Sequence, residues 1–230
     1  MQENIKKLQA YFAAEKKKIA NLSFQQKVRY IIGYYWLWIL GIGAALYLSG
    51  YMVYRGFFTP KDYWFYGMFA NTMVNEGNGS ELWQDFVSFA EYDTRQKKVE
   101  INSASWFDPS VSGGTNNSYY QAFVAMVESG DLDVLVMGED GLKGVGSSGR
   151  LLDLRDDRCS HLLEQYSDRI IYCDPYDTEY SGEPVPIGID LSDSLLVTKY
   201  HLYEEECALG IGAYTKRTES VATFLRFALQ

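Results

Sequence analysis

The stretch SYYQAFVAMVESGDLDVLVM, residues 118–137, places a helix-period segment directly before a short, continuous apolar run. Ser118 and Gln121 form a capping-box pair at the start of the helical part, and a glycine follows its last turn. The run from Asp133 to Met137 is almost entirely apolar, as is typical of a strand that helices cover on both faces. This helix-then-strand unit predicts an α/β fold.

The same alternation continues on both sides of this unit. Because apolar runs of strand length alternate with helix-period stretches, the pattern favours βαβ units and a single, mainly parallel sheet flanked by helices. Residues 63–230 have the length of one compact domain. Further strands are expected at 64–70, 99–103, 169–173, 185–190 and 208–213, and helices after Ser80, at 160–166 and around 221–228.

A block without any charged residue, Tyr30 to Tyr54, precedes the domain. As a helix its 25 residues would rise about 37 Å, enough to cross a hydrocarbon core of roughly 30 Å with some tilt. Tyrosine and tryptophan crowd both ends of the block, where membrane interfaces favour them. We therefore predict a transmembrane helix. A cleaved signal peptide is the rival interpretation, although the apolar run is longer than usual for one and no clear cleavage site follows.

The charge is distributed unevenly around this block. Residues 1–29 carry seven basic and two acidic side chains, whereas the rest of the chain carries 14 basic and 28 acidic ones. Because basic flanks are retained in the cytoplasm, we predict a cell-membrane protein with a cytoplasmic amino terminus, a span at 30–54, a linker at 55–62 and an extracytoplasmic domain at 63–230. Within residues 1–29 an apolar stripe fits either a helix on an anionic membrane surface or a solvated helix: Ile5, Leu8, Phe12 and Ile19.

Several function classes are disfavoured by composition and motif. A region of net charge −14 repels phosphate, so we expect no nucleic-acid partner. Residues 144–149 match G-x-G-x-x-G, but they do not join a strand directly to a helix, and we interpret them as a flexible turn and expect no cofactor. His161 and His201 lack partners at metal-ligand spacing, so no metal site is predicted. In the absence of a nucleophile elbow or a zinc-protease motif, we expect no enzyme.

The three cysteines leave several arrangements open. In an oxidising compartment Cys159 could pair with Cys173, or Cys173 with Cys207, and one thiol would be left over in either case. Three free, partly buried thiols fit the sequence equally well.

A candidate binding site follows from the expected topology. In open α/β sheets, ligands bind beyond the carboxyl ends of the strands. Polar side chains around one tryptophan at these positions could hold a polar solute or a peptide, although caps and turns require the same residue types. The residues selected by this rule are Asn71, Thr72, Ser105, Trp106, Glu139, Asp140, Asp190, Ser192 and Asp193.

The domain resembles one lobe of an extracytoplasmic solute-binding protein of the type II periplasmic-binding-protein fold. The resemblance lies in the order of the helix at 118–130, the strand at 132–136 and the turn Gly149-Arg150-Leu151-Leu152-Asp153-Leu154. The segment 208–213 followed by 216–225 looks like the return strand of that lobe and its helix. The chain is also similar to membrane-tethered, single-lobe relatives in Gram-positive bacteria.

The resemblance implies a binding or interaction domain, such as an accessory to a transporter or envelope complex. Only residues 174–206 stand where a second lobe would be inserted, and they are too few to form one. Because a one-sided site leaves its ligand half in water, we expect a protein partner or a weakly held ligand rather than high-affinity solute capture. A receptor whose cleft is completed by a dimer or a partner, and an extracytoplasmic enzyme of unknown type, are the alternatives.

Overall fold

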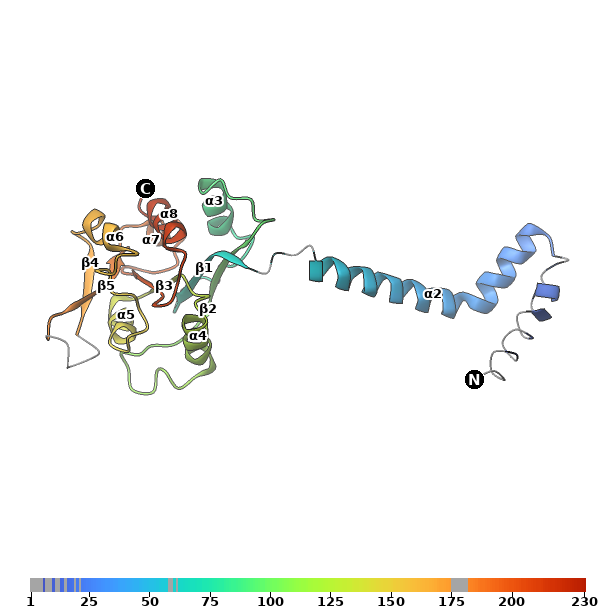
Figure 1. Cartoon of the computed structure of the whole chain (residues 1–230), viewed down its shortest axis with the longest axis horizontal. Helices are drawn as coiled ribbons and strands as arrows, with labels where there is room; N and C mark the ends of the chain where they lie inside the picture. Colours follow the sequence, from blue (N-terminus) through green and yellow to red (C-terminus); the bar gives the residue numbers. More distant parts are fainter. Residues whose placement is uncertain are drawn as a thin grey trace. The chain divides into compact units, whose positions relative to one another are not determined.

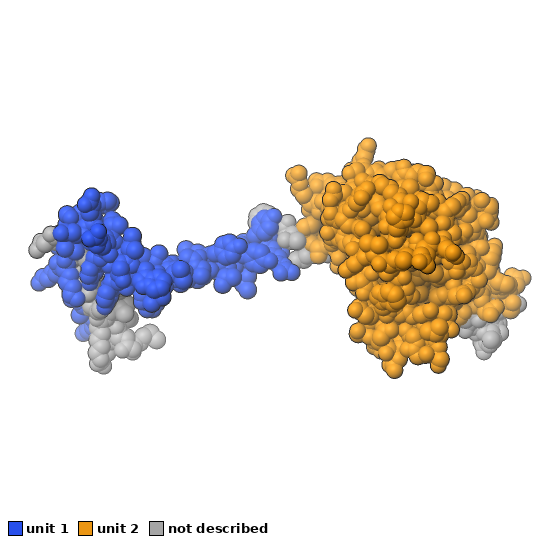
Figure 2. Space-filling model, turned by 180° about the vertical axis from the view of Figure 1, so that it is seen from behind, with its two compact units in different colours: residues 1–59 blue, residues 60–230 orange. Residues whose placement is uncertain are grey.

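The computed structural model describes residues 22–57, 60, 62–174 and 182–230, together with 6, 10, 13, 14, 16–18 and 20. It divides into two compact units, residues 1–59 and residues 60–230 (Figure 2). The apolar stripe predicted within residues 1–29 lies outside the described residues.

The first unit is dominated by one long helix, α2, which spans Phe24–Phe57. Its segment Ile32–Gly56 is 25 residues long and apolar enough to cross a membrane. The most apolar stretch of this segment is not buried by any other part of the protein that the structure describes. Large apolar side chains such as Leu40 and Leu46 are more than 60% exposed. A helix that is apolar on all sides and has no protein cover requires another apolar environment, which agrees with the predicted span.

The second unit is a six-stranded sheet with helices on both faces (Figure 1). Its strand order is β2-β1-β3-β6-β5-β4. The strands are β1 Tyr63–Ala70, β2 Lys98–Ser105, β3 Val134–Met137, β4 Ile170–Cys173, β5 Val185–Asp190 and β6 Ala208–Ile211, and the helices are α3 Glu81–Phe89, α4 Ser118–Glu128, α5 Glu139–Gly146, α6 Ser160–Gln165, α7 Leu195–Thr198 and α8 Thr218–Ala228.

The α/β class and the single sheet are confirmed, but the mainly parallel character is not. β1 runs parallel to β2 and β3, whereas the pairs β3–β6, β6–β5 and β5–β4 are antiparallel. The reason lies in the connections. Between β5 and β6 the chain forms only the four-residue helix α7 and leaves Asp190 paired with Ala208, so it returns at the same end of the sheet. Parallel neighbours need a crossover that carries the chain back to the other end.

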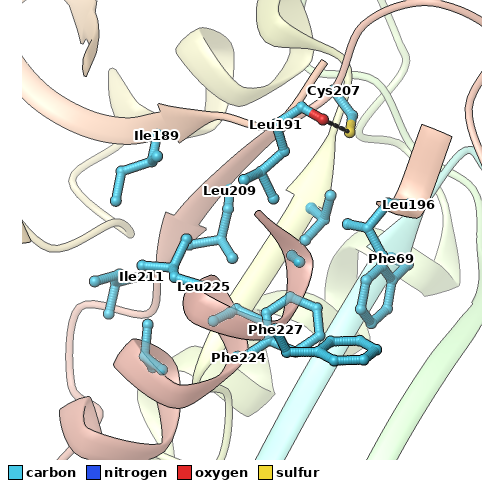
Figure 3. Close-up of a cluster of buried hydrophobic side chains, with 14 of the residues drawn as sticks. Phe69, Ile189, Leu191, Leu196, Cys207, Leu209, Ile211, Phe224, Leu225 and Phe227 are labelled. Carbon is cyan, nitrogen blue, oxygen red and sulfur yellow. Dashed lines mark hydrogen bonds between the residues drawn. The ribbon is translucent and has the colours of Figure 1, made fainter. Parts of the chain in front are cut away.

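The two faces of the sheet bury separate hydrophobic clusters. On one face, side chains of α3, α6, α7 and α8 pack against Phe65, Phe69 and Leu209 (Figures 1 and 3). On the other face, α4 and α5 cover Met68 and Leu135. The central strands are therefore covered on both sides, which explains why they appear in the sequence as continuous apolar runs.

Of the two predicted helix caps, one needs correction. The side chain that caps α4 is Asn117, whose Oδ1 accepts a hydrogen bond from Tyr120 N at 2.9 Å, so the predicted capping box at Ser118 is displaced by one residue. An extended Asn117 can cap this helix in the way that was expected of Ser118. The cap predicted at Ser80 is confirmed, because its hydroxyl oxygen accepts from Trp83 N.

The glycine motif at 144–149 is not a flexible turn, because its first three residues belong to α5. Leu142 and Val145, on one side of this helix, are fully buried in the core. A Cβ at Gly144 would lie 2.9 Å from Pro109, and one at Gly146 would lie 2.7 Å from Ile187. The glycines therefore allow α5 to approach the sheet and the loop that follows β2 more closely than larger residues would.

A buried carboxylate joins the amino end of β3 to its neighbours. Asp133 is fully buried, and its Oδ2 accepts hydrogen bonds from Tyr66 N at 2.8 Å and from Arg217 Nε at 3.0 Å. The hydroxyl of Thr215 donates to Oδ1 of the same carboxylate. Arg217 also donates to the carbonyl oxygens of Gly130 and Asp131. Burial raises the pKa of Asp133, and the hydrogen bonds from Arg217 and Thr215 oppose that shift.

Replacing Arg217 with alanine should therefore destabilise the domain by about 3 kcal/mol, because it leaves the Asp133 carboxylate buried without its counter-ion. Chemical denaturation of the full chain in detergent, followed by tryptophan fluorescence, measures this loss. Arg226→Ala is the matched control, since Arg226 is exposed and donates to the Thr223 hydroxyl, and its removal should change stability by less than about 0.5 kcal/mol. Equal losses in the two variants would contradict the assigned role of the ion pair.

Candidate functional site

The carboxyl ends of several strands lie at the same end of the sheet, as the rule for open α/β sheets requires. Ala70 at the end of β1 pairs with Ser105 at the end of β2. In the next pairs along the sheet, Met137 and Asp190 both lie opposite Ala208. The segments that follow β1, β2, β3 and β5 therefore lie at this end of the sheet, together with the loop that leads into β6.

A hollow of about 280 Å³ opens at this end of the sheet, and we call it the acidic hollow. It lies at the start of α5, beyond the ends of β1 and β3. Three of the nine predicted site residues line it: Asn71, Glu139 and Asp140. Its other lining residues are Asp108, Ser110, Met137, Gly138, Gly141, Tyr203 and Glu206.

Asn71 shapes the hollow rather than offering a free amide to it. Its backbone is left-handed, with φ of 60°, a conformation that asparagine tolerates better than most residues. Its side-chain Nδ2 donates to Phe107 O at 2.8 Å, while its Oδ1 accepts from Phe107 N at 3.0 Å. The side chain thus fixes the loop after β2 against the end of β1.

Tyr203 is a lining residue that sequence reasoning missed. It is 7% exposed, and its hydroxyl lies 2.8 Å from Val136 O and 3.2 Å from Ala70 O, where it donates. It thereby ties together the ends of β1 and β3. Burial raises its pKa well above the usual value, so it stays protonated and serves as a donor. No sequence signal marked it, because it follows the short helix α7 far along the chain from both strands.

The lining carries four carboxylates, those of Asp108, Glu139, Asp140 and Glu206. Lys143, one turn further along α5, contacts Glu139 Oε1 at 2.5 Å. The pKa of Lys143 is raised, chiefly by this hydrogen bond and further by the charges of Asp140 and Glu206. The described lining thus has four carboxylates and no basic side chain, with the Lys143 ammonium beside it, and the hollow favours a cationic group.

The other predicted residues have structural roles. Thr72 is buried and its hydroxyl donates to Ser103 O at 2.9 Å, and Ser105 is buried as well. The Oδ1 of Asp190 accepts from both the backbone and the hydroxyl of Ser192. Asp193 pairs with Arg169, which lowers the pKa of that carboxyl. Trp106 is 61% exposed at the end of β2 but does not line the acidic hollow.

A second hollow, of about 520 Å³, continues from the first along α5. Ser110 and Asp140 line both hollows, so the two adjoin each other beside the helix. We call this second part the α5 hollow. Besides the two shared residues, its lining consists of Lys143, Gly144, Ser147, Tyr172, Cys173, Asp174 and Pro184.

The cysteines are free thiols, and all three are buried. Cys159 and Cys207 belong to one hydrophobic cluster, whereas Cys173 belongs to the cluster on the opposite face of the sheet. Neither pairing considered from the sequence is formed, because the sheet separates Cys173 from the other two. The Cys207 thiol donates to Leu191 O (Figure 3). Within the described ranges no group of three or more histidine, cysteine or acidic residues is arranged to hold a metal ion.

Comparisons of the chain with protein-family models, with curated proteins and with solved structures found no match.

The thiols should resist modification in the folded protein. Burial raises the pKa of Cys159 to about 11 and that of Cys207 to about 12, so thiolate is scarce at pH 8. We expect Ellman's reagent to label none of the three within minutes in the folded chain and all three after unfolding in guanidinium, with no reductant added. Fewer than three reactive thiols in the unfolded, unreduced chain would instead indicate a disulfide.

Proposed function

We propose that this chain is a single-pass membrane protein whose extracytoplasmic α/β domain is a binding module, related in form to one lobe of a solute-binding protein. The observation that carries the proposal is the acidic hollow, where the ends of β1 and β3 and the start of α5 bring four carboxylates around one open cavity. Its preferred ligand is a cationic group, presented by a protein partner or by a peptide. A role as an accessory to a transporter or envelope complex fits such a module.

The membrane placement is supported by the exposed apolar segment Ile32–Gly56 and by the charges on either side of it. Residues 1–29 have a net charge of +5, whereas the rest of the chain has −14. Because basic flanks stay in the cytoplasm, this asymmetry favours an external acidic domain. The alternative, a cleaved signal sequence, would release the same domain outside the membrane.

The shape of the site supports binding at a surface rather than enclosure of a free solute. Sites for small molecules usually enclose about 300–1,000 Å³ and cover most of the ligand. The volume of the acidic hollow is slightly smaller than that. The described residues between β4 and β6 form strand β5 of the same sheet and the short helix α7 on its face, and they do not form a covering lobe. A ligand in this hollow would therefore keep one side open to water or to a partner.

Binding rather than catalysis is also favoured by the state of the thiols and of the site tyrosine. Burial raises the pKa values of Cys159 and Cys207 far above neutrality, so both thiols are poor nucleophiles. The hydroxyl of Tyr203 is engaged by two backbone carbonyl oxygens. These groups hold the ends of the strands in place.

The proposed topology predicts the outcome of protease treatment. Protease added to intact cells should remove residues 60–230 and spare an amino-terminal epitope tag, because the tag would lie in the cytoplasm. Immunoblotting with antibodies against each end measures this. Protection of both ends, or recovery of the chain from the soluble cytosol, would overturn the placement.

Trilysine should bind the acidic hollow weakly, and increasing salt should weaken the binding further because the attraction is electrostatic. In heteronuclear NMR of the full chain in detergent, we expect trilysine to shift the signals of Asp140 and Glu206 and triglutamate to shift neither. The double variant Asp140→Asn/Glu206→Gln should reduce the affinity at least fivefold. Asp157→Asn is the matched control, because this exposed carboxylate is not part of the lining. Equal binding of the two tripeptides would refute the cationic preference.

A further inference from the structure

The two edge strands of the sheet differ in how their outer backbone groups are satisfied. On β2, three of the outward groups are bound by side chains that lie along the edge. Trp83 Nε1 donates to Val99 O at 2.8 Å, Asn78 Oδ1 accepts from Ile101 N at 3.0 Å, and Thr72 donates to Ser103 O at 2.9 Å. Such side chains block a further strand from pairing with this edge.

The edge formed by β4 has no such cover among the described residues. Asp190 N donates to Arg169 O at 2.8 Å, which shows that the backbone of Arg169 faces β5. Because successive residues of a strand direct their backbone groups to opposite sides, the N–H and C=O groups of Ile170 and Tyr172 face outward. No hydrogen bond to these four outward groups occurs within the described ranges. Tyr172 is also 49% exposed.

Hollows lie on both faces of the sheet beside this edge. On the face covered by α6, a hollow of about 600 Å³ is lined by Leu163, Tyr172, Pro184 and Pro186, with Arg155 and Glu183 beside them. On the opposite face is the α5 hollow, of about 520 Å³, which contains Asp140 and Asp174. Tyr172 and Pro184 line both hollows, so the edge runs between them.

We propose that β4 is a docking edge for an extended segment of a partner protein, which adds a seventh strand to the sheet. In such a strand, alternate side chains would enter the two hollows. The hollow on the α6 side suits an apolar side chain because leucine, proline and tyrosine line it. The α5 hollow suits a lysine or arginine, since Asp140 and Asp174 outweigh Lys143, which Glu139 already engages.

Charge favours a partner of this chemistry over a second copy of the chain. The chain after residue 29 has a net charge of −14, so two copies of the domain repel each other, whereas a segment with alternating apolar and basic residues is attracted. The α5 hollow adjoins the acidic hollow at Ser110 and Asp140, but the β4 backbone and the hollow on the α6 side are separate from it, so the proposal stands whether or not the acidic hollow binds a cation.

The probe that tests this is a fluorescein-labelled peptide of alternating valine and lysine, Val-Lys-Val-Lys-Val, added to the full chain in lipid nanodiscs. We expect saturable binding by fluorescence anisotropy. Tyr172→Pro removes one outward N–H without touching the ladder to β5, and it should weaken binding at least tenfold. Tyr172→Val keeps both the N–H and an apolar side chain, and it should weaken binding less than threefold.

A second probe keeps the test independent of the folding of the proline variant. The same peptide N-methylated at alternate residues, in each of the two possible phases, is tested against the unaltered chain. One phase should bind at least tenfold more weakly, because it has lost the N–H groups that would pair with β4. Glu206→Gln, which alters the acidic hollow but neither hollow beside β4, should leave the affinity for the valine–lysine peptide within twofold, which separates this proposal from the acidic hollow.

Three results would overturn the proposal. The first is no binding of the valine–lysine peptide. The second is binding that neither Tyr172→Pro nor N-methylation in either phase weakens. The third is a concentration-dependent doubling of mass that Tyr172→Pro abolishes, which would make a second copy of the chain the occupant of this edge.

Discussion

The interaction on which this domain depends most is the burial of the Asp133 carboxylate at the amino end of β3. It accepts hydrogen bonds from β1 through Tyr66 N, and from the segment between β6 and α8 through Thr215 and Arg217. Gly212 N, just after β6, donates to the carbonyl oxygen of the same residue. Three strands and the segment that leads into α8 are therefore tied to one residue, and misplacing Arg217 would leave its carboxylate buried without a counter-ion. Such a penalty favours one arrangement of strands over its alternatives.

The consequences of this anchor reach the opposite end of the sheet. Fixing β3 between β1 and β6 sets the register Phe69↔Val136 and Met137↔Ala208, and this register brings the ends of β1 and β3 together. Tyr203 then donates to carbonyl oxygens of both strands at that end. The acidic hollow forms above this junction, where the first turn of α5 supplies Glu139 and Asp140. Acidic side chains are favoured at a helix amino terminus, so part of this acidity also stabilises α5.

The sequence predicted those features that depend on local patterns. The apolar helix, the six strands and helices α3, α4, α6 and α8 appear within a few residues of their expected positions, because each has its own periodicity and composition. Helix α5 was not predicted, because its glycines were interpreted as a turn. Strand direction was not predictable in this way, since the run at 208–211 is equally apolar whether it pairs parallel or antiparallel with β3. At the site, Asn71, Glu139 and Asp140 followed from the topology rule. Tyr203 and Asp108 did not, because they come from loops whose course depends on tertiary packing.

A membrane anchor would change what these shallow surfaces need to achieve. A one-sided hollow and a four-residue strand edge both leave their ligands partly in water, so each alone offers only modest affinity. Two proteins held in the same membrane meet at a high effective concentration, because most of the translational freedom is lost before they touch. Under the proposed topology, weak and separate contacts at the acidic hollow and at β4 would therefore be sufficient together for a partner in the same membrane. A freely diffusing solute gains no such advantage, so the same physics favours a protein partner over a captured small molecule.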